Sequence, residues 1–296
     1  MQTIQYSGLK CVLLENKSLS LTVTQSAGPR ILSLRLPGGE NLFAELPNGT
    51  LDCPGVGKFH FYGGHRLWHA PEEPARTYLP DDQPVSILPE ENGLMVSQQV
   101  ETQTGIKKSM HICLPGEGPK VVIRHTLTNH GLWPVECAPW AITQMKLGGV
   151  AILPQSAQNT GVLANRFLTI WPYTDIKDPY IQWGNRYIFF RTGRESGAIK
   201  LGFPNPRGWL AYWLDGTLFV KKAAFDPTAT YYDSGCSSEC YCDYRFLELE
   251  TLAPVSTLPP NGSVSHTETW QVYDNVDFSP DEATVQALVE NLGLEQ

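Results

Sequence analysis

The 296-residue chain has no apolar run of the roughly 18 residues that a membrane-spanning helix needs. It also has no basic run and no stripe of basic and aromatic side chains. With a formal net charge of -8, we expect neither nucleic acid nor membrane as a partner. The opening residues, MQTIQYSGLK, lack the apolar core of a secretion signal. The seven cysteines, an odd number, then indicate reduced thiols and predict a cytoplasmic protein.

Several catalytic motifs are missing as well. The sequence has no G-x-S-x-G elbow, no Gly-rich phosphate loop and no dinucleotide fingerprint, so a serine hydrolase or a nucleotide-dependent enzyme has no support. Cys236, Cys240 and Cys242 are spaced C-x3-C-x-C, without the paired C-x2-C of a zinc site. We interpret them as buried thiols, and we expect neither a cofactor nor a metal.

The composition that remains is typical of strands and turns. The chain is 42% hydrophobic and 10% aromatic, contains 26 Gly and 23 Pro, and has only 18% charged residues. Turn signals recur at short intervals, and no linker or internal repeat divides the chain. We therefore predict one all-β unit over residues 1–296, with roughly 15 to 20 short strands.

Local patterns predict some of these elements. Residues 93–113 are typical of a β-hairpin, and the apolar segments between 187 and 225 indicate a meander. Residues 46–62, rich in Pro and Gly, are interpreted as a loop. Only residues 279–294 have a helical pattern, for which Ser279 can act as the N-cap.

One polar and aromatic cluster follows the pair Gly63-Gly64. His65 and His69 have the four-residue spacing of a helical metal pair, but the flanking Gly and Pro residues argue against a helix. In an extended strand they lie roughly 13 Å apart, too far to share a metal. Arg66 can bind oxygen atoms and Trp68 can stack on a ring, so the segment favours a ligand site over a purely structural role.

A second candidate is the pair of carboxylates Glu248 and Glu250. If residues 246–252 form a strand, both side chains project from one face, where like charges raise each other's proton affinity. The pair can supply a general base for proton transfer on a sugar, or the two acids of a glycosidase. The structural alternative is a polar strand face that is solvated or paired with Lys and Arg.

These residues resemble a known family. The segments Glu239-Cys240-Tyr241 and Leu247–Thr251 are similar to the C-terminal catalytic segment of galactose mutarotases, also called aldose 1-epimerases. SAGPRILSLRLPGGENLF, HTLTNHGLWPVECAPWAI and PPNGSVSHTETWQVY resemble the opening hairpin, central strand pair and closing strand of that family. The resemblance implies a large antiparallel β-supersandwich with a sugar site on a concave sheet face, to which the residue pattern adds the short C-terminal helix. It also implies Glu250 as the base that deprotonates the anomeric hydroxyl.

The chain departs from the family in one strand. Ala138–Ile142 lacks the His that serves mutarotases as general acid. Our first hypothesis is therefore an enzyme acting on a free sugar, with Glu250 as base, His65 or His69 as acid, and Arg66, Trp68, Lys221 and Glu248 around the substrate. The second hypothesis is a carbohydrate-binding or sugar-sensing protein without catalysis on the same fold. A polysaccharide hydrolase or lyase is the third.

Overall fold

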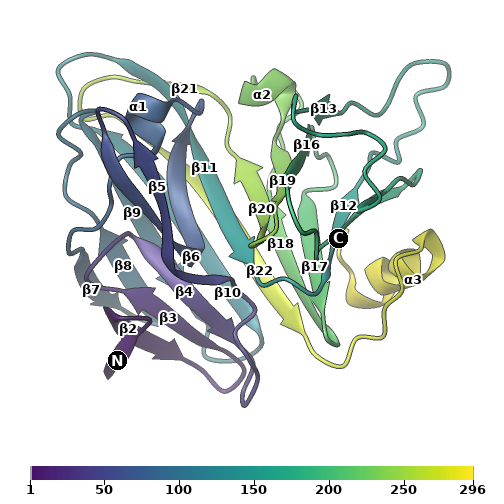
Figure 1. The fold of residues 1–296 in the computed structure, drawn as a ribbon, viewed down its shortest axis with the longest axis horizontal. Helices are drawn as coiled ribbons and strands as arrows, with labels where there is room; N and C mark the ends of the chain where they lie inside the picture. Colours follow the sequence, from purple (N-terminus) through teal and green to yellow (C-terminus); the bar gives the residue numbers. More distant parts are fainter. Residues whose placement is uncertain (1, 296) are drawn as a thin grey trace.

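The computed structural model describes residues 2–295 as two antiparallel β-sheets and three short helices (Figure 1). The sheets stack face to face, because apolar residues from both of them make up the largest buried cluster. The prediction of an antiparallel β-supersandwich with a short C-terminal helix is confirmed. None of the helices within residues 2–295 has the length and apolar character needed to cross a membrane.

The first sheet carries the candidate site and is called the site sheet. Its strands, in spatial order, are β1 (Gln2–Tyr6), β2 (Leu9–Glu15), β3 (Ser20–Thr24), β4 (Arg30–Arg35), β6 (Gly57–Ala70), β11 (Val135–Met145), β20 (Leu247–Leu252), β19 (Ser238–Cys242), β16 (Ile199–Phe203) and β13 (Thr169–Ile170). Two further strands extend it: β5 (Glu45–Cys53) pairs with β6, and β21 (Ser256–Leu258) pairs with β11.

The second sheet covers one face of the site sheet. In spatial order its strands are β14 (Ile181–Gln182), β15 (Tyr187–Arg191), β12 (Val150–Pro154), β17 (Trp209–Leu214), β18 (Thr217–Ala223), β22 (Ser263–Tyr273), β10 (Lys120–Asn129), β9 (Ile106–Cys113), β8 (Gly93–Ser97) and β7 (Ser86–Glu90).

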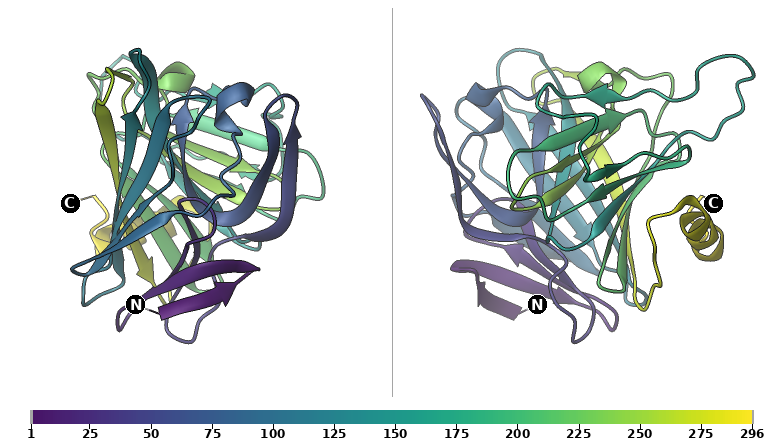
Figure 2. Two further views of the ribbon diagram at one scale, coloured as in Figure 1. Left: turned by 90° about the vertical axis from the view of Figure 1, so that its left-hand side faces the viewer. Right: turned by 45° about the vertical axis from the view of Figure 1, so that its right-hand side comes forward.

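The helices are short and peripheral. They are α1 (Pro74–Thr77), α2 (Tyr232–Gly235) and α3 (Glu282–Leu292). Helix α3 lies on the outer side of the second sheet (Figure 2). Its side chains Val285 and Val289 are buried against that sheet. Its N-cap is Asp281, whose side chain accepts the backbone N–H of Thr284, so the predicted cap at Ser279 is wrong by two residues.

Some predicted elements are correct and others are not. The hairpin over 93–113 is confirmed as β8 and β9. The expected loop at 46–62 is wrong, because most of it forms β5 and the start of β6, and only Pro54, Gly55 and Val56 lie in the turn between them. The expected meander is also wrong: β16 pairs with β19 in the site sheet, whereas β17 and β18 pair in the second sheet.

The glycine pair shapes β6, the longest strand. Gly63 and Gly64 both have positive φ, at 92° and 71°. A Cβ on Gly63 would lie 1.9 Å from the carbonyl oxygen of Ala44, and one on Gly64 would lie 2.1 Å from that of Ile31. Only glycine tolerates this conformation and this close approach. The pair therefore lets one continuous strand pair first with β5 and then with β4 and β11, which places Arg66 and Trp68 in the middle of the site sheet.

A long segment between β12 and β13 projects from the body (Figures 1 and 2). Its apolar side chains Val162, Leu163 and Phe167 are strongly exposed. The segment is held by local hydrogen bonds, including one from Asn165 Nδ2 to the carbonyl oxygen of Gln158 at 2.8 Å. It leads directly to Trp171 and Tyr173, which line the cavity described next.

Candidate functional site

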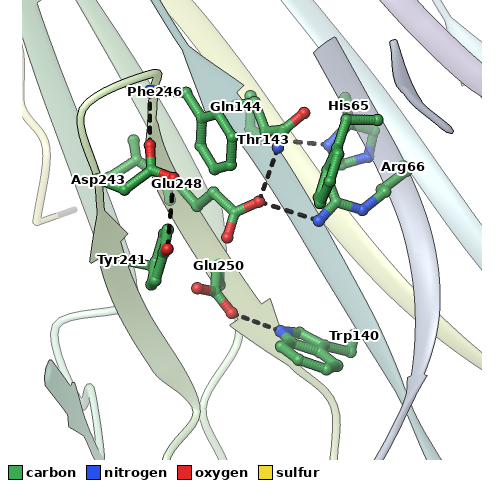
Figure 3. A network of polar contacts seen from close by, with 12 residues as sticks. His65, Arg66, Trp140, Thr143, Gln144, Tyr241, Asp243, Phe246, Glu248 and Glu250 are labelled. Carbon is green, nitrogen blue, oxygen red and sulfur yellow. Dashed lines mark hydrogen bonds and ion pairs between the residues drawn. The ribbon is translucent and has the colours of Figure 1, made fainter. Parts of the chain in front are cut away.

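The candidate site lies on the outer face of the site sheet, which we call the front face. Strand alternation places Arg66 and Trp68 of β6 on this face, opposite Ile142 and Trp140 of β11. The row continues across the sheet, because Ile142 pairs with Glu250. The prediction that Glu248 and Glu250 share a strand face is confirmed, since both belong to β20 and both side chains contact front-face residues (Figure 3).

A cavity of about 400 Å³ opens on the front face. Its volume falls in the range of roughly 300–1,000 Å³ that is usual for small-molecule sites. Aromatic side chains predominate among the lining residues, which are Leu51, Phe61, Arg66, Trp68, Glu72, Tyr78, Trp140, Trp171, Tyr173, Ala198, Lys200, Tyr241, Arg245, Phe246 and Glu248. Glu248 thus reaches the cavity wall, whereas Glu250 is fully buried beside it.

Glu248 is held by two donors. Arg66 Nη2 lies 2.9 Å and Gln144 Nε2 lies 3.0 Å from its Oε1 (Figure 3). Burial raises the pKa of Glu248 because it disfavours the charged form, and the neighbouring Arg66 offsets only part of this effect. The carboxyl is therefore suited to exchanging a proton closer to neutral pH than an exposed glutamate.

The Arg66 guanidinium also stacks on Trp68, at 4.1 Å from the ring centroid, and only 5% of Trp68 is exposed. Trp68 therefore supports Arg66, and its predicted role as a stacking platform is not supported by this burial. Tyr173 is 48% exposed and offers an accessible ring on the cavity wall.

Glu250 belongs to a second ion cluster. Lys200 Nζ lies 3.0 Å from Glu250 Oε2 and 2.6 Å from Glu239 Oε2. Trp140 Nε1 donates to Glu250 Oε2 at 2.7 Å. Lys200 Nζ sits between the rings of Trp140 and Trp171, at 4.9 and 4.7 Å from their centroids. Burial alone would lower the pKa of Lys200, but the two carboxylates outweigh it and raise the pKa well above its usual value. Lys200 is therefore a cation held inside the cavity wall.

Several buried front-face atoms lack a hydrogen-bond partner within residues 2–295. They are the donors Nε and Nη1 of Arg66 and the acceptors Oε1 of Gln144, Glu250 and Glu239, while Glu239 Oε2 has the ion pair with Lys200. Buried polar atoms without a partner are uncommon in native proteins, because each costs about 1–3 kcal/mol. Donors and acceptors side by side under an aromatic cavity suit a ligand that carries several hydroxyl groups.

Three predicted site residues have their side chains on the opposite face of the site sheet, between the two sheets; we call this the back face. His65 Nε2 lies 2.7 Å from His125 Nε2 of β10, and His69 Nε2 lies 3.5 Å from Glu101. Lys221 reaches the back of the site sheet from β18. The expectation that these side chains line the cavity with Arg66 is wrong. His65 and His69 alternate with Arg66 and Trp68 along β6 and so face the opposite side, and Lys221 belongs to the sheet behind.

On the back face, His65, His125 and their neighbours form a closed hydrogen-bond network, which does not include His69. His125 Nδ1 faces the carbonyl oxygen of His266 at 3.1 Å, which assigns a proton to that nitrogen. Burial holds the pKa of His65 and of His125 below its usual value, so both rings are neutral. His125 Nε2 then accepts from His65 Nε2, and His65 Nδ1 accepts from the hydroxyl of Thr143 at 2.9 Å.

The acid in this network is Glu268. Burial alone would raise its pKa, but the Lys221 ammonium and the neighbouring histidines outweigh burial and lower it. Lys221 Nζ lies 2.9 Å from Glu268 Oε1, and Trp270 Nε1 donates to Oε2 at 2.9 Å. Thr251 donates to the same carboxylate and accepts from His266 Nε2 at 2.7 Å.

Ligand atoms of His65, His125 and Glu268 lie within 4.8 Å of one another, as a metal site would require. Two imidazole nitrogens bound to one tetrahedral zinc lie about 3.3 Å apart, given Zn–N bonds of roughly 2.0–2.1 Å. The observed 2.7 Å fits a hydrogen bond better, and Lys221 already supplies the positive charge beside Glu268. We therefore assign this cluster as a hydrogen-bond network.

Sequence reasoning did not select Lys200 or Trp140, although both contact Glu250. The only local signal for Lys200 is a charged residue within the apolar strand segment AIKLGF. Trp140 lies in the segment noted for its missing His. Neither signal identifies Glu250 as the partner, because the contact depends on how distant strands pair.

Comparison with known proteins identifies the fold. No protein-family model and no curated protein sequence matches this chain. Among solved structures, a galactose mutarotase-like protein from Lactobacillus casei matches with a TM-score of 0.53 and 9% identity, covering 89% of this chain and 100% of that one. A galactose mutarotase related enzyme from Lactobacillus acidophilus matches with a TM-score of 0.51 and 9% identity, covering 90% and 98%. The Slr1438 protein from Synechocystis sp. PCC 6803 matches with a TM-score of 0.57 and 12% identity, covering 93% and 100%. The chain therefore has the galactose mutarotase-like fold.

Proposed function

We propose that the front-face cavity binds a carbohydrate and performs acid–base chemistry on it, as aldose 1-epimerases do. The observation that carries this proposal is the group of unpartnered donors and acceptors on Arg66, Gln144 and Glu250 beside an aromatic-lined cavity. Sugar hydroxyls both donate and accept hydrogen bonds, and sugar ring faces pack on aromatic side chains. The likeness to galactose mutarotase-like structures supports the same class of ligand.

In this proposal Glu250 is the base. Its Oε1 has no hydrogen-bond partner among residues 2–295, whereas its Oε2 is held by Trp140 and Lys200. One oxygen is thus oriented and the other is free to take the proton of the anomeric hydroxyl. Glu248, which reaches the cavity wall, then binds a neighbouring hydroxyl.

We assign the role first expected of His65, that of the acid, to the front-face cations Lys200 and Arg66. Lys200 and Arg66 line the cavity, and His65 does not. An N–H group aimed at the ring oxygen stabilises the negative charge that develops there when the ring opens. Mutarotation already proceeds in water, so an acid–base contribution of roughly 10²–10⁴-fold is sufficient.

The test is the rate of anomer exchange, measured by polarimetry or NMR on a panel of aldoses. We expect acceleration with at least one aldose and its loss in Glu250→Gln, which keeps the shape and the Trp140 contact. Lys58→Gln, a change at an exposed strand position, is the control for altered surface charge. The proposal fails if no aldose is accelerated, or if Glu250→Gln exchanges as fast as the wild type.

A second function is favoured by one observation, the absence of His from the cavity lining within residues 2–295. The carboxylates there are also paired with Arg66 and Lys200. This arrangement suits a protein that binds a sugar without converting it. Calorimetry that detects sugar binding, together with no anomer exchange, would select this second function.

A further inference from the structure

Lys221 crosses from the second sheet to the back of the site sheet. Its Nζ lies 3.0 Å from the carbonyl oxygens of Ala141 and Leu249, and 3.1 Å from Thr143 Oγ1. The fourth oxygen is Oε1 of Glu268, at 2.9 Å. One ammonium thus joins two neighbouring strands of the site sheet, β11 and β20, to β22 of the second sheet.

The positions of these contacts connect Lys221 to the cavity. Ala141 and Thr143 alternate along β11 with Trp140 and Gln144, whose side chains lie on the front face. Leu249 lies between Glu248 and Glu250 in β20. Because successive strand residues face opposite sides, a shift of any contacted residue moves the front-face side chains beside it.

Stability alone does not explain this pair. Lys221 and Glu268 are both fully buried. Removing two charges from water costs several kcal/mol per ion, and replacing such a pair by uncharged residues of similar size is often neutral or stabilising. A fully buried pair that binds the backbone of both site strands has its more specific effect on their relative position.

We propose that Lys221 is a positioning residue of the front-face cavity, which fixes β11 relative to β20 and thereby sets the distance between Trp140 and Glu250. The sugar-binding part of this inference rests on the proposed function. The geometric part does not, since the Trp140–Glu250 hydrogen bond exists without a ligand.

The test uses the double variant Lys221→Met/Glu268→Gln, which removes the pair without leaving an unpaired charge. The glutamine oxygen can still accept from Trp270 Nε1, and its amide N–H can donate to the Thr251 hydroxyl. The first readout is the indole N–H resonance of Trp140 in ¹H–¹⁵N NMR, assigned with Trp140→Phe. We expect this resonance to move or broaden in the double variant. The second readout is affinity for any aldose that the wild type binds, which we expect to fall roughly tenfold to a hundredfold.

The matched control is Lys108→Met/Glu101→Gln. This is another buried Lys–Glu pair, at 2.5 Å, and it makes no hydrogen bond to β11 or β20 within residues 2–295. We expect it to leave the Trp140 resonance unchanged. A folded Lys221→Met/Glu268→Gln protein with the wild-type Trp140 resonance would overturn the proposal. If the wild type binds no aldose, the proposed function fails while the resonance still decides the role of Lys221.

A milder variant decides the question if the double variant does not fold. Thr143→Val keeps the side-chain shape but removes the hydroxyl that joins Lys221 to His65. We expect a smaller displacement of the Trp140 resonance in the same direction. An unchanged resonance in this folded variant would also overturn the proposal.

Discussion

Strands β6, β11 and β20 carry buried polar groups on both faces, and the two faces differ in how completely those groups are paired. On the back face, the polar atoms of His65, His125, Lys221 and Glu268 all have partners. The exception is His69 near the end of β6, whose ring nitrogens have no hydrogen bond among residues 2–295 and whose Nε2 faces Glu101 at 3.5 Å. On the front face, Arg66, Gln144 and Glu250 each keep a buried atom without one. A satisfied network stabilises a fold, whereas unsatisfied atoms beside a cavity are available to a ligand. The difference distinguishes polar residues with a structural role from those that we propose bind a ligand on the same strands.

The largest effect is expected when the proposed base is neutralised. Glu250→Gln should lower the rate of anomer exchange roughly 10²–10⁴-fold, because the amide cannot take a proton. The free energy of unfolding should change little, because Lys200 keeps Glu239 as its partner. Urea unfolding measured beside the exchange rate checks both statements. A large loss of stability would place Glu250 with the structural residues.

The second largest effect is expected on the back face. Lys221→Met leaves the charge of Glu268 buried without its partner, so the free energy of unfolding should fall by about 3–5 kcal/mol. Adding Glu268→Gln should restore most of it, because the remaining charge is removed. Both variants are compared by urea denaturation. Equal stabilities of the single and double variants would show that the pair is not coupled.

A smaller effect is expected from pH. Burial lowers the pKa of His266 to about 3, with Glu268 opposing and His125 and Lys221 reinforcing the shift, whereas an unfolded His has a pKa of about 6.5. Below about pH 6.5 the unfolded chain therefore binds a proton that the folded chain does not, and stability falls as the pH falls. His266→Gln should remove roughly 1.4 kcal/mol per pH unit from this slope.

The measurement for His266 is the free energy of unfolding of both proteins between pH 5 and pH 7.5. Glu239 and Glu248 have raised pKa values and oppose the trend, but they do so equally in both proteins and cancel in the difference. Parallel curves for the wild type and His266→Gln would contradict a neutral, buried His266.

The smallest effect is expected at the cavity rim. Tyr173 is 48% exposed and lines the cavity, so Tyr173→Ala should weaken sugar binding by about 0.5–1.5 kcal/mol through the loss of stacking area. Stability should stay within about 0.5 kcal/mol, as for most surface substitutions. Calorimetry measures the sugar affinity of this variant, and thermal unfolding measures its stability. An unchanged affinity would show that the sugar does not contact Tyr173 and binds in another part of the cavity.

Period-two alternation makes part of this arrangement predictable. It places Glu248 and Glu250 on one face of their strand, and it applies equally to β6, where Arg66 and Trp68 share one face and His65 and His69 the other. Grouping all four β6 residues in one site ignored that rule. The contact between Lys200 and Glu250 was not predictable. It depends on β16 pairing with β19 in the site sheet, whereas β15 and β17, which precede and follow β16 in the chain, belong to the second sheet.

Strand β6, with its Gly63-Gly64 pair, and its neighbours in the site sheet also limit where the chain tolerates insertions and deletions. Adding one residue inside β11 would turn Thr143 toward the cavity and Gln144 toward the interior, so both polar sets would lose their partners at once. The projecting segment that carries Val162 has no such double constraint and can change in length without touching either set. We therefore expect natural variation in length to accumulate beside the cavity, in the segment that leads to Tyr173, while β6, β11 and β20 keep their register.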